Sequence, residues 1–278
     1  MGKILWLASY PKSGNTWLRL FLGNLVSGSR TPFDINRLGE VTLAEPGTAG
    51  FALFDARPWQ QWSDAEIAAL RPKVQERISQ TREGVIPVKT HSAFVKVGGI
   101  ATINMNVTQG AVYVVRNPLD VAISYAHHQG VGLDEMIEIL NTDMFTTPSN
   151  EVNVYEVMGS WSQHVASWTA SESPNVHVMR YEDMARDPLA AFSRLAAFMR
   201  IQTTPEAVAR AVGHADFKEA ARMENAAGFK ERTPAQERFF RSGKPGQWRD
   251  LLSDRQIGAV VKAHRAQMQR FGYVPDGY

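Results

Sequence analysis

The chain has 278 residues, of which 44% are hydrophobic and 21% charged, and its formal net charge is +2. This composition supports a sizeable core and lacks the basic excess that non-specific nucleic-acid binding needs. There is no cysteine, which excludes disulfides, thiolate metal sites and a cysteine nucleophile. The apolar residues 4–8 are too few for a signal sequence, and no segment reaches membrane-spanning length. We therefore expect one cytoplasmic domain over residues 1–278, without a nucleic-acid or membrane partner.

Four short runs rich in β-branched and aromatic residues predict strands. They are residues 3–9, 84–90, 111–116 and 175–181. Each run is nearly continuous in its apolar character, which is typical of strands buried on both faces. The four runs therefore favour the centre of a parallel sheet.

Helical spacing of apolar residues predicts helices between and after these strands. They are residues 16–26, 118–128, 133–140, 156–171, 189–199, 205–212 and 253–271. Ser63 and Glu66 form a capping-box pattern that opens another helix, which Pro72 should kink or split. The alternation predicts an α/β fold of P-loop-like, three-layer type. In this fold a central parallel sheet of about four to five strands is flanked by helices and binds ligands at the carboxyl ends of its strands.

The turn after the first strand reads "YPKSGNTW" (residues 10–17). Glycine beside a cation and hydroxyls, between a strand and a helix, makes a nest of backbone N–H groups for an oxyanion of phosphate size. The turn is not a Walker A loop, because position 7 is leucine and Gly14 follows Lys12. The alternative is a surface turn with a solvated lysine.

The second strand ends in "VKTH", which places Lys89 and His91 on the same side of the extended chain. Neutral imidazole is the side chain best suited to take a proton from a hydroxyl at physiological pH. A lone histidine is more often structural, so its position at a strand end carries the hypothesis.

The third strand ends at Arg116, and Ser124 follows eight residues later, about two helical turns into the next helix. Both side chains could reach a phosphate over the edge of the sheet. An ion pair between Arg116 and Asp120 is the alternative, and it would be favoured if this motif stood alone.

The stretch "FKERTPAQERFFRSGKPGQWRD" (residues 229–250) carries six cationic side chains, and Gly243 and Gly246 allow its backbone to bend around an anion. Such a run is usually a solvated loop. Its embedded Phe239, Phe240 and Trp248 indicate instead that it packs onto the body of the protein.

The motifs "YPKSGNTW", "VKTH", "VVRNPLDVAISY", "YEDM" and "FFRSGKPGQW", in this order and at these intervals, resemble the cytosolic-type sulfotransferases. That family uses 3′-phosphoadenosine 5′-phosphosulfate (PAPS) and releases 3′-phosphoadenosine 5′-phosphate (PAP). The resemblance spans residues 5 to about 250. The opening "WLASYPKSGNTWLR" is most similar to the bacterial branch, which includes sulfotransferases that modify antibiotic scaffolds.

The resemblance implies that His91 is the catalytic base and that Lys12 and Lys89 act on the transferring group. It also implies a donor site. The sequence has neither an HExxH motif nor a carboxylate cluster with ligand spacing, so we expect no metal. The donor-site residues are Lys12, Ser13, Gly14, Asn15, Thr16, Trp17, Arg116, Ser124, Tyr181, Phe217, Arg241, Ser242 and Gly243. Ser242 stands where the family commonly has lysine, which leaves the 3′-phosphate one cation poorer. The animal dimer motif is not evident, so the oligomeric state stays open.

We expect sulfuryl transfer to a hydroxyl of a bulky, partly aromatic small molecule. The alternatives are a small-molecule kinase and a non-catalytic nucleotide-binding protein. Two stretches, residues 27–62 and the residues after Ser124 through Asn153, could line the acceptor pocket or simply cover the core. Weak periodicity marks residues 27–62 and 141–153 within them. Their apolar candidates are Phe33, Phe51, Phe54, Trp59, Trp62, Tyr125, Met136, Met144 and Phe145.

Overall fold

The centre of the fold is β1 (Lys3–Ser9), an almost wholly buried strand that pairs in parallel with β3 (Val85–Thr90) on one side and β6 (Thr108–Val115) on the other. The computed structural model describes residues 2–278. β2 (Leu43–Ala44) and β7 (Val176–Arg180) complete a five-stranded parallel sheet in the order β2-β3-β1-β6-β7. The predicted α/β fold with a central parallel sheet is therefore confirmed. β2 was not predicted, because a strand of two residues is too short to show an apolar run or an alternation of apolar and polar residues.

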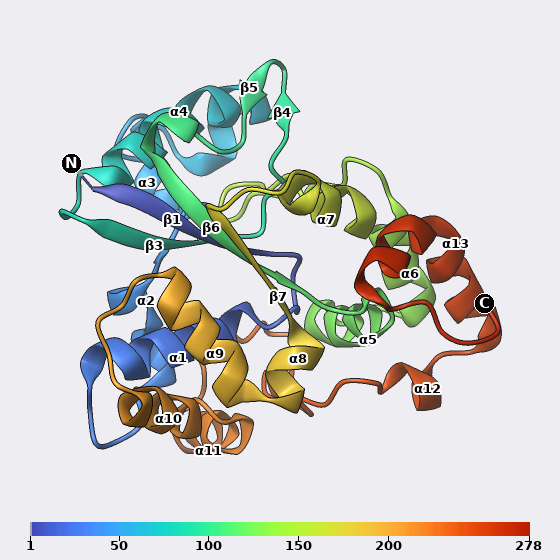
Figure 1. Cartoon of the computed structure of the whole chain (residues 1–278). Helices are drawn as coiled ribbons and strands as arrows, with labels where there is room; N and C mark the ends of the chain where they lie inside the picture. The colour runs from blue at the N-terminus through green and yellow to red at the C-terminus, as the bar shows by residue number, and fades with distance from the viewer. Residues whose placement is uncertain (1) are drawn as a thin grey trace.

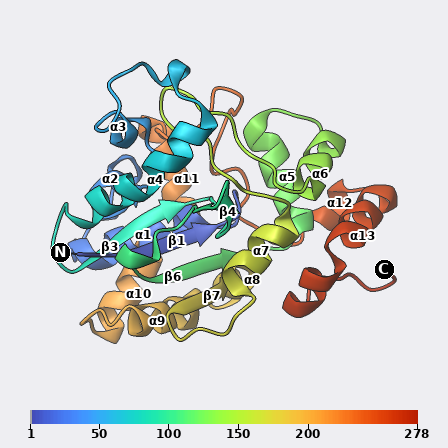
Figure 2. The ribbon, with the colours of Figure 1, turned by 90° about the horizontal axis from the view of Figure 1, so that it is seen from above.

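Alternate residues of the sheet enter two separate cores. Ile4 and Trp6 face one core, and Leu5 and Leu7 face the other. Helices α4 (Asp64–Ser79) and α7 (Trp161–Thr169) lie on one side of the sheet, and α1 (Asn15–Ser27), α9 (Pro188–Phe198) and α10 (Pro205–His214) lie on the other (Figures 1 and 2). These are the three expected layers.

Two predicted helices differ from the structure. The helix expected over residues 156–171 begins only at Trp161, because Ser160 caps it in a capping box with Gln163 and Gly159 has a positive φ of 64°. The capping box of Ser63 and Glu66 is confirmed at α4, but Pro72 lies inside this helix without splitting it. The amphipathic helix α11 (Phe217–Ala227) was not predicted.

The remaining elements complete the chain. The helices are α2 (Leu38–Val41), α3 (Thr48–Phe51), α5 (Pro118–Gln129), α6 (Leu133–Asn141), α8 (Tyr181–Arg186), α12 (Trp248–Leu251) and α13 (Asp254–Phe271). The short 3-10 helices are η1 (Ile35–Arg37), η2 (Trp59–Gln61) and η3 (Met105–Val107), and β4 (Lys96–Val97) pairs antiparallel with β5 (Ile100–Ala101).

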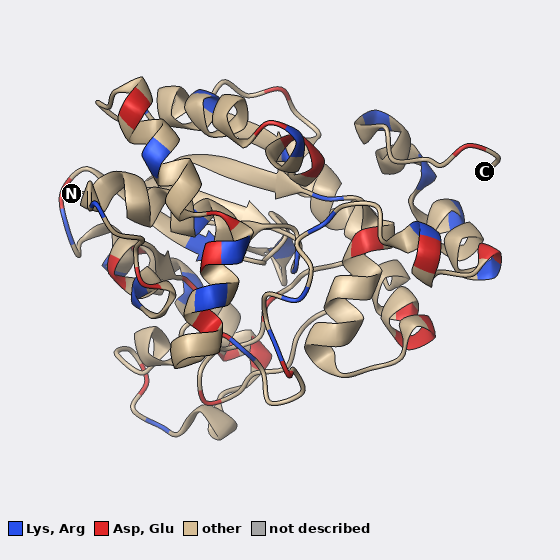
Figure 3. Cartoon of the chain, turned by 90° about the horizontal axis from the view of Figure 1, so that it is seen from below, with Lys and Arg blue, Asp and Glu red and all other residues tan. Residues whose placement is uncertain are grey.

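Charges of both signs are interspersed over the helices and loops in Figure 3, in keeping with the small net charge. Within residues 2–278, no helix is both long and apolar enough to cross a bilayer.

Candidate active site

Three segments that carry candidate residues meet at the carboxyl edge of the sheet. The turn after β1 holds Lys12 and Gly14, His91 follows β3 directly, and Arg116 follows β6. Because these three strands are neighbours in the sheet, segments far apart in the sequence lie together at one edge. This is the edge at which open α/β sheets bind their ligands.

The turn after β1 is a strained cradle. Lys12 has a positive φ of 64° and Gly14 one of 112°, so the backbone curls before α1 begins. A Cβ at Gly14 would lie 2.8 Å from Cδ2 of Tyr181, which explains glycine at this position. Lys12 Nζ and Ser13 Oγ are buried without a hydrogen-bond partner in residues 2–278. Two such donors in adjacent residues suit an anionic ligand.

Burial sets the charge of Lys12. Desolvation, with further lowering by the positive charges of Arg116 and Lys89, brings the pKa of Lys12 from 10.5 to about 7. The ring of Phe239 covers the ammonium group, with Nζ 3.7 Å from the ring centroid. The cation-π contact offsets part of the cost of burial, but an aromatic face cannot replace an oxyanion.

Arg116 is 5% exposed and holds the cradle in place. Its Nη1 donates to the carbonyl of Lys12 at 3.0 Å, and its guanidinium lies over the ring of Tyr181 at 4.2 Å. Nε is buried without a partner in the described chain. The alternative of an ion pair with Asp120 is wrong: that carboxylate instead accepts the backbone N–H groups of Gly246 at 2.6 Å and Trp248 at 3.2 Å.

An aromatic platform adjoins Arg116. Trp17 meets Tyr181 edge to face with ring centroids 5.9 Å apart, and the Tyr181 hydroxyl donates to the carbonyl of Gly243 at 2.6 Å. A Cβ at Gly243 would lie 2.4 Å from Cδ2 of Phe217, so this ring packs on the glycine backbone. Four predicted donor residues are thereby in one cluster.

His91 has a defined tautomer. Its Nδ1 lies 2.7 Å from the carbonyl oxygen of Ser9, so Nδ1 carries the proton and Nε2 is left to accept one. Burial, assisted by the positive charge of Lys89, lowers the pKa of His91 well below 6.5. The imidazole is therefore neutral at pH 7, which is the form that a general base requires.

Lys89 is not a free cation. Its Nζ lies 3.8 Å from Glu231, which also accepts two hydrogen bonds from the buried Arg19 at 2.7 and 3.0 Å. Burial alone would raise the pKa of Glu231. The positive charges of Lys89 and Arg19 have the larger combined effect and hold this pKa below its usual range. The carboxylate thus stays charged between the two cations.

Residues 229–248, here called the covering segment, pack onto the protein body as predicted. The buried carboxylate of Glu224 accepts the backbone N–H groups of Phe239 at 2.7 Å and Phe240 at 2.9 Å. Asp120 holds the segment further along, through Gly246 and Trp248. The sequence did not predict that these two carboxylates hold the covering segment. Their backbone partners lie more than ten residues away along the chain, so no local pattern indicates the contacts.

Some predicted donor residues are less closely tied to the cluster. The side chains of Thr16, Ser124 and Ser242 make no hydrogen bond within residues 2–278. Arg241 is exposed and donates to Gln247 at 2.7 Å. Asn15 uses Nδ2 to hold the carbonyl of Leu7 at 2.8 Å, so its amide supports the end of β1.

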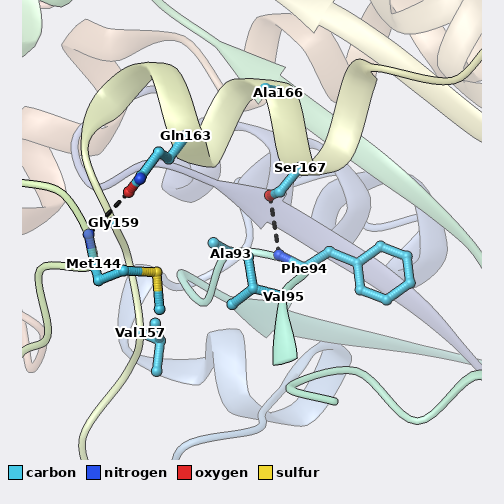
Figure 4. A pocket seen from close by; sticks show the side chains of 9 residues that line it. All are labelled: Ala93, Phe94, Val95, Met144, Val157, Gly159, Gln163, Ala166 and Ser167. Atoms are coloured by element: carbon cyan, nitrogen blue, oxygen red, sulfur yellow. Dashed lines mark hydrogen bonds between the residues drawn. The ribbon is translucent and has the colours of Figure 1, made fainter. Parts of the chain in front are cut away.

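A half-open hollow of about 420 Å³ lies beside the segment that follows His91. Its lining is mostly apolar and includes Ala93, Phe94, Val95, Met144, Val157 and Ala166 (Figure 4). Of the predicted acceptor residues, only Met144 lines it in the described chain. Within residues 2–278 there is no group of three or more histidine or acidic side chains that could hold a metal ion.

The family model described as "Sulfotransferase domain" matches residues 3–272. The chain is 26% identical over 277 residues to flavonol 3-sulfotransferase of Flaveria bidentis, covering 93% of this chain and 79% of that protein. It is 24% identical to luciferin sulfotransferase of Photinus pyralis, covering 90% and 68%. The structure is similar to that of mouse sulfotransferase SULT7A1 complexed with PAP, with a TM-score of 0.62 and 21% identity over 96% of this chain and 85% of that one. The structural likeness shows that the fold is shared.

The contact between Gly14 and Tyr181 can be tested with two alanine substitutions. Gly28 also has a positive φ, 59°, but a Cβ there would meet nothing within 4 Å. Gly28→Ala should lower the free energy of unfolding by about 1 kcal/mol, the cost of left-handed backbone for an L-residue. Gly14→Ala should cost roughly 1–3 kcal/mol more, because the new methyl group overpacks the ring. Urea unfolding measures both, and equal losses would show that Tyr181 does not pack tightly on the cradle.

Proposed function

Because the chain belongs to the sulfotransferase domain family, we propose that it transfers the sulfuryl group of PAPS to a hydroxyl of a small-molecule acceptor. One observation carries the donor assignment. Three buried polar atoms have no hydrogen-bond partner in residues 2–278: Lys12 Nζ, Ser13 Oγ and Arg116 Nε. The Arg116 side chain also donates a hydrogen bond to the carbonyl of Lys12. Buried donors without partners are costly unless a ligand satisfies them, and these three suit anionic oxygens.

The predicted donor residues divide among three parts of the nucleotide. Lys12, Ser13 and the backbone of residues 14–16 hold the 5′ end; PAPS supplies there the sulfuryl group to be transferred. Arg116, aided by Ser124 and residues 241–243, holds the 3′-phosphate. Trp17, Tyr181 and Phe217 hold the adenine, a role supported by the edge-to-face contact of Trp17 with Tyr181 and by the packing of Phe217 on Gly243.

The proposed catalytic residues remove a proton from the acceptor and stabilise the negative charge that develops during transfer. His91 Nε2 takes the proton of the acceptor hydroxyl while the acceptor oxygen bonds to sulfur and the bond from sulfur to the phosphate oxygen breaks. Lys12 stabilises the negative charge left on that phosphate oxygen, and Lys89 stabilises the sulfuryl oxygens. The neutral state of His91 at pH 7 supports this assignment, as does its Nε2, which has no hydrogen-bond partner within residues 2–278.

Two rival functions make different predictions for ligand choice. A small-molecule kinase would bind ADP at least as well as PAP, since ATP lacks a 3′-phosphate. A non-catalytic nucleotide-binding protein would need no neutral histidine beside the cradle. The buried Arg116, which has no carboxylate partner among residues 2–278, favours a ligand with an additional phosphate.

Binding of PAP should cause Lys12 to take up a proton. With a pKa of about 7, Lys12 is about 90% neutral at pH 8 and about 10% neutral at pH 6. A phosphate beside it favours the charged form, so we expect uptake of about 0.9 proton at pH 8 and about 0.1 at pH 6. Calorimetry in two buffers of different ionisation enthalpy measures this uptake.

Three controls accompany that titration. Lys12→Met should abolish the uptake, and the same change at the exposed Lys262 should preserve it. ADP should bind at least about tenfold more weakly than PAP, because it lacks the phosphate assigned to Arg116. Absence of proton uptake at pH 8 would contradict the Lys12 assignment, and equal affinities for ADP and PAP would favour a kinase.

The base assignment predicts a separation of catalysis from donor binding. His91→Ala should lower kcat by about 10² to 10⁴-fold, the usual contribution of a general base. The affinity for PAP should stay within about twofold, because the imidazole faces the acceptor rather than the nucleotide. Single-turnover transfer and PAP calorimetry on the same preparation measure both effects. Transfer within about tenfold of the parent chain would refute His91 as the base.

We propose that the acceptor is bulky and partly aromatic and that its apolar part occupies the hollow of Figure 4. The hollow begins at Ala93, two residues beyond the base, and its apolar walls and volume suit a small molecule. The names of the relatives, which include flavonol and luciferin sulfotransferases, support acceptors of this kind. A place in the bacterial branch and a cytoplasmic location remain predictions.

Filling the hollow tests where the acceptor binds. Ala166→Phe places a ring among the lining residues and should raise the acceptor KM by about tenfold, with PAP affinity unchanged. Ala170→Phe changes an exposed residue at the end of the same helix and should leave KM within about twofold. A panel of hydroxylated aromatics and alcohols, read by the mass gain of one sulfo group, supplies the acceptor. An unchanged KM in Ala166→Phe would place the acceptor elsewhere.

A further inference from the structure

The main chain of His91 is held on both sides by buried side chains. Its N–H donates to Oε1 of Glu156 at 2.8 Å, and its carbonyl accepts from Nε2 of His164 at 3.0 Å. With the bond from its own ring to Ser9, this residue has three anchors on three different segments. No helix or strand imposes these contacts, because His91 lies just beyond the end of β3.

The tautomer of His164 follows from its partners. Nε2 faces a carbonyl oxygen and must carry the proton, so Nδ1 accepts a hydrogen bond from the Tyr113 hydroxyl at 2.9 Å. Both side chains are fully buried, Tyr113 on β6 and His164 on α7. Burial lowers the pKa of His164 to about 4, which keeps the ring neutral. The pair therefore links β6 and α7 to the carbonyl of His91.

Glu156 is 8% exposed and lies four residues before the cap of α7. Its own backbone N–H donates to Thr147 Oγ1 at 2.9 Å, which fixes the position from which the carboxylate reaches His91. The next residue continues the contact, because the Val157 carbonyl accepts the N–H of Ala93 at 2.7 Å. The segment of Glu156 and the segment of His91 thus run side by side.

We propose that Glu156 and the Tyr113–His164 pair are positioning residues that fix the main chain of His91. A fixed main chain keeps Nδ1–H on Ser9 and leaves Nε2 directed at the acceptor, since a general base works only within hydrogen-bond reach of the proton it removes. The inference rests on the proposed role of His91 as the base. A purely structural role would stabilise the fold without affecting the imidazole.

The test combines kinetics with ¹⁵N NMR of the histidine rings, which reports the tautomer of each. The chain has 7 histidines, and the spectrum of His91→Gln identifies the signals of His91. Glu156→Ala and His164→Phe should each lower kcat by about 10 to 100-fold, with PAP affinity within about twofold. Their His91 signals should show a mixture of tautomers in place of a single Nδ1–H form.

Conservative and matched variants separate positioning from folding. Glu156→Gln keeps an acceptor oxygen and should retain most of kcat. His264→Phe removes another buried histidine, whose ring faces Ser162 and does not contact His91, and should leave the His91 tautomer and kcat unchanged. PAP binding in every variant confirms that the donor site has folded.

Two results would overturn the inference: an unchanged His91 tautomer in both Glu156→Ala and His164→Phe, or an equal loss of kcat in His264→Phe. Failure of the proposed role of His91 as the base would look different. His91→Gln would then retain transfer, while the NMR spectra would still report whether the two positioning contacts fix the ring.

Discussion

The burial of the Lys12 ammonium is the constraint on which the rest of the site depends. An unpaired charge inside a protein costs several kcal/mol, and the protein lowers that cost by letting the lysine lose its proton near pH 7. Arg116 and Lys89 increase the cost through repulsion, whereas Glu231 and Glu224 reduce it. The arrangement leaves strong, buried donors oriented before any ligand arrives. An anion that enters them gains hydrogen bonds without reorganising the protein, which is the advantage of a preorganised site.

The covering segment shows how side chains can hold a loop that has almost no secondary structure. Backbone groups of residues 229–248 that leave water when the segment packs onto the protein cost free energy unless they find hydrogen-bond partners. Glu224 and Asp120 each accept two backbone N–H groups from this segment, and the Tyr181 hydroxyl donates to one of its carbonyls. Because Tyr181 also packs against Gly14, the covering segment and the cradle hold a defined relation to each other. Phe239 can therefore sit over Lys12.

The sequence predicted the strands and the strand ends well, because continuous apolar runs and turn residues are local signals. β1 has the predicted limits, and Lys12, His91 and Arg116 all lie at one edge of the sheet. Contacts between distant segments could not be predicted. Glu156 was assigned to a helix that starts five residues later, and no sequence pattern singled out His164 within that helix. Their partners, the backbone of His91 and the hydroxyl of Tyr113, are set by the packing of α7 against the sheet.

Lys12 and His91 have lowered pKa values from the same principal cause, yet the consequences for the two residues are opposite. A neutral imidazole can accept a proton, so burial prepares His91 for its proposed role as the base. A neutral amine cannot stabilise an anion, so burial alone leaves Lys12 unprepared at pH 8 until an anion restores its charge. Occupation of the cradle by an anion therefore restores the charge of Lys12, whereas His91 is in its basic form before any ligand arrives. Of the two residues, only Lys12 depends on a filled donor site for the protonation state that its proposed role requires.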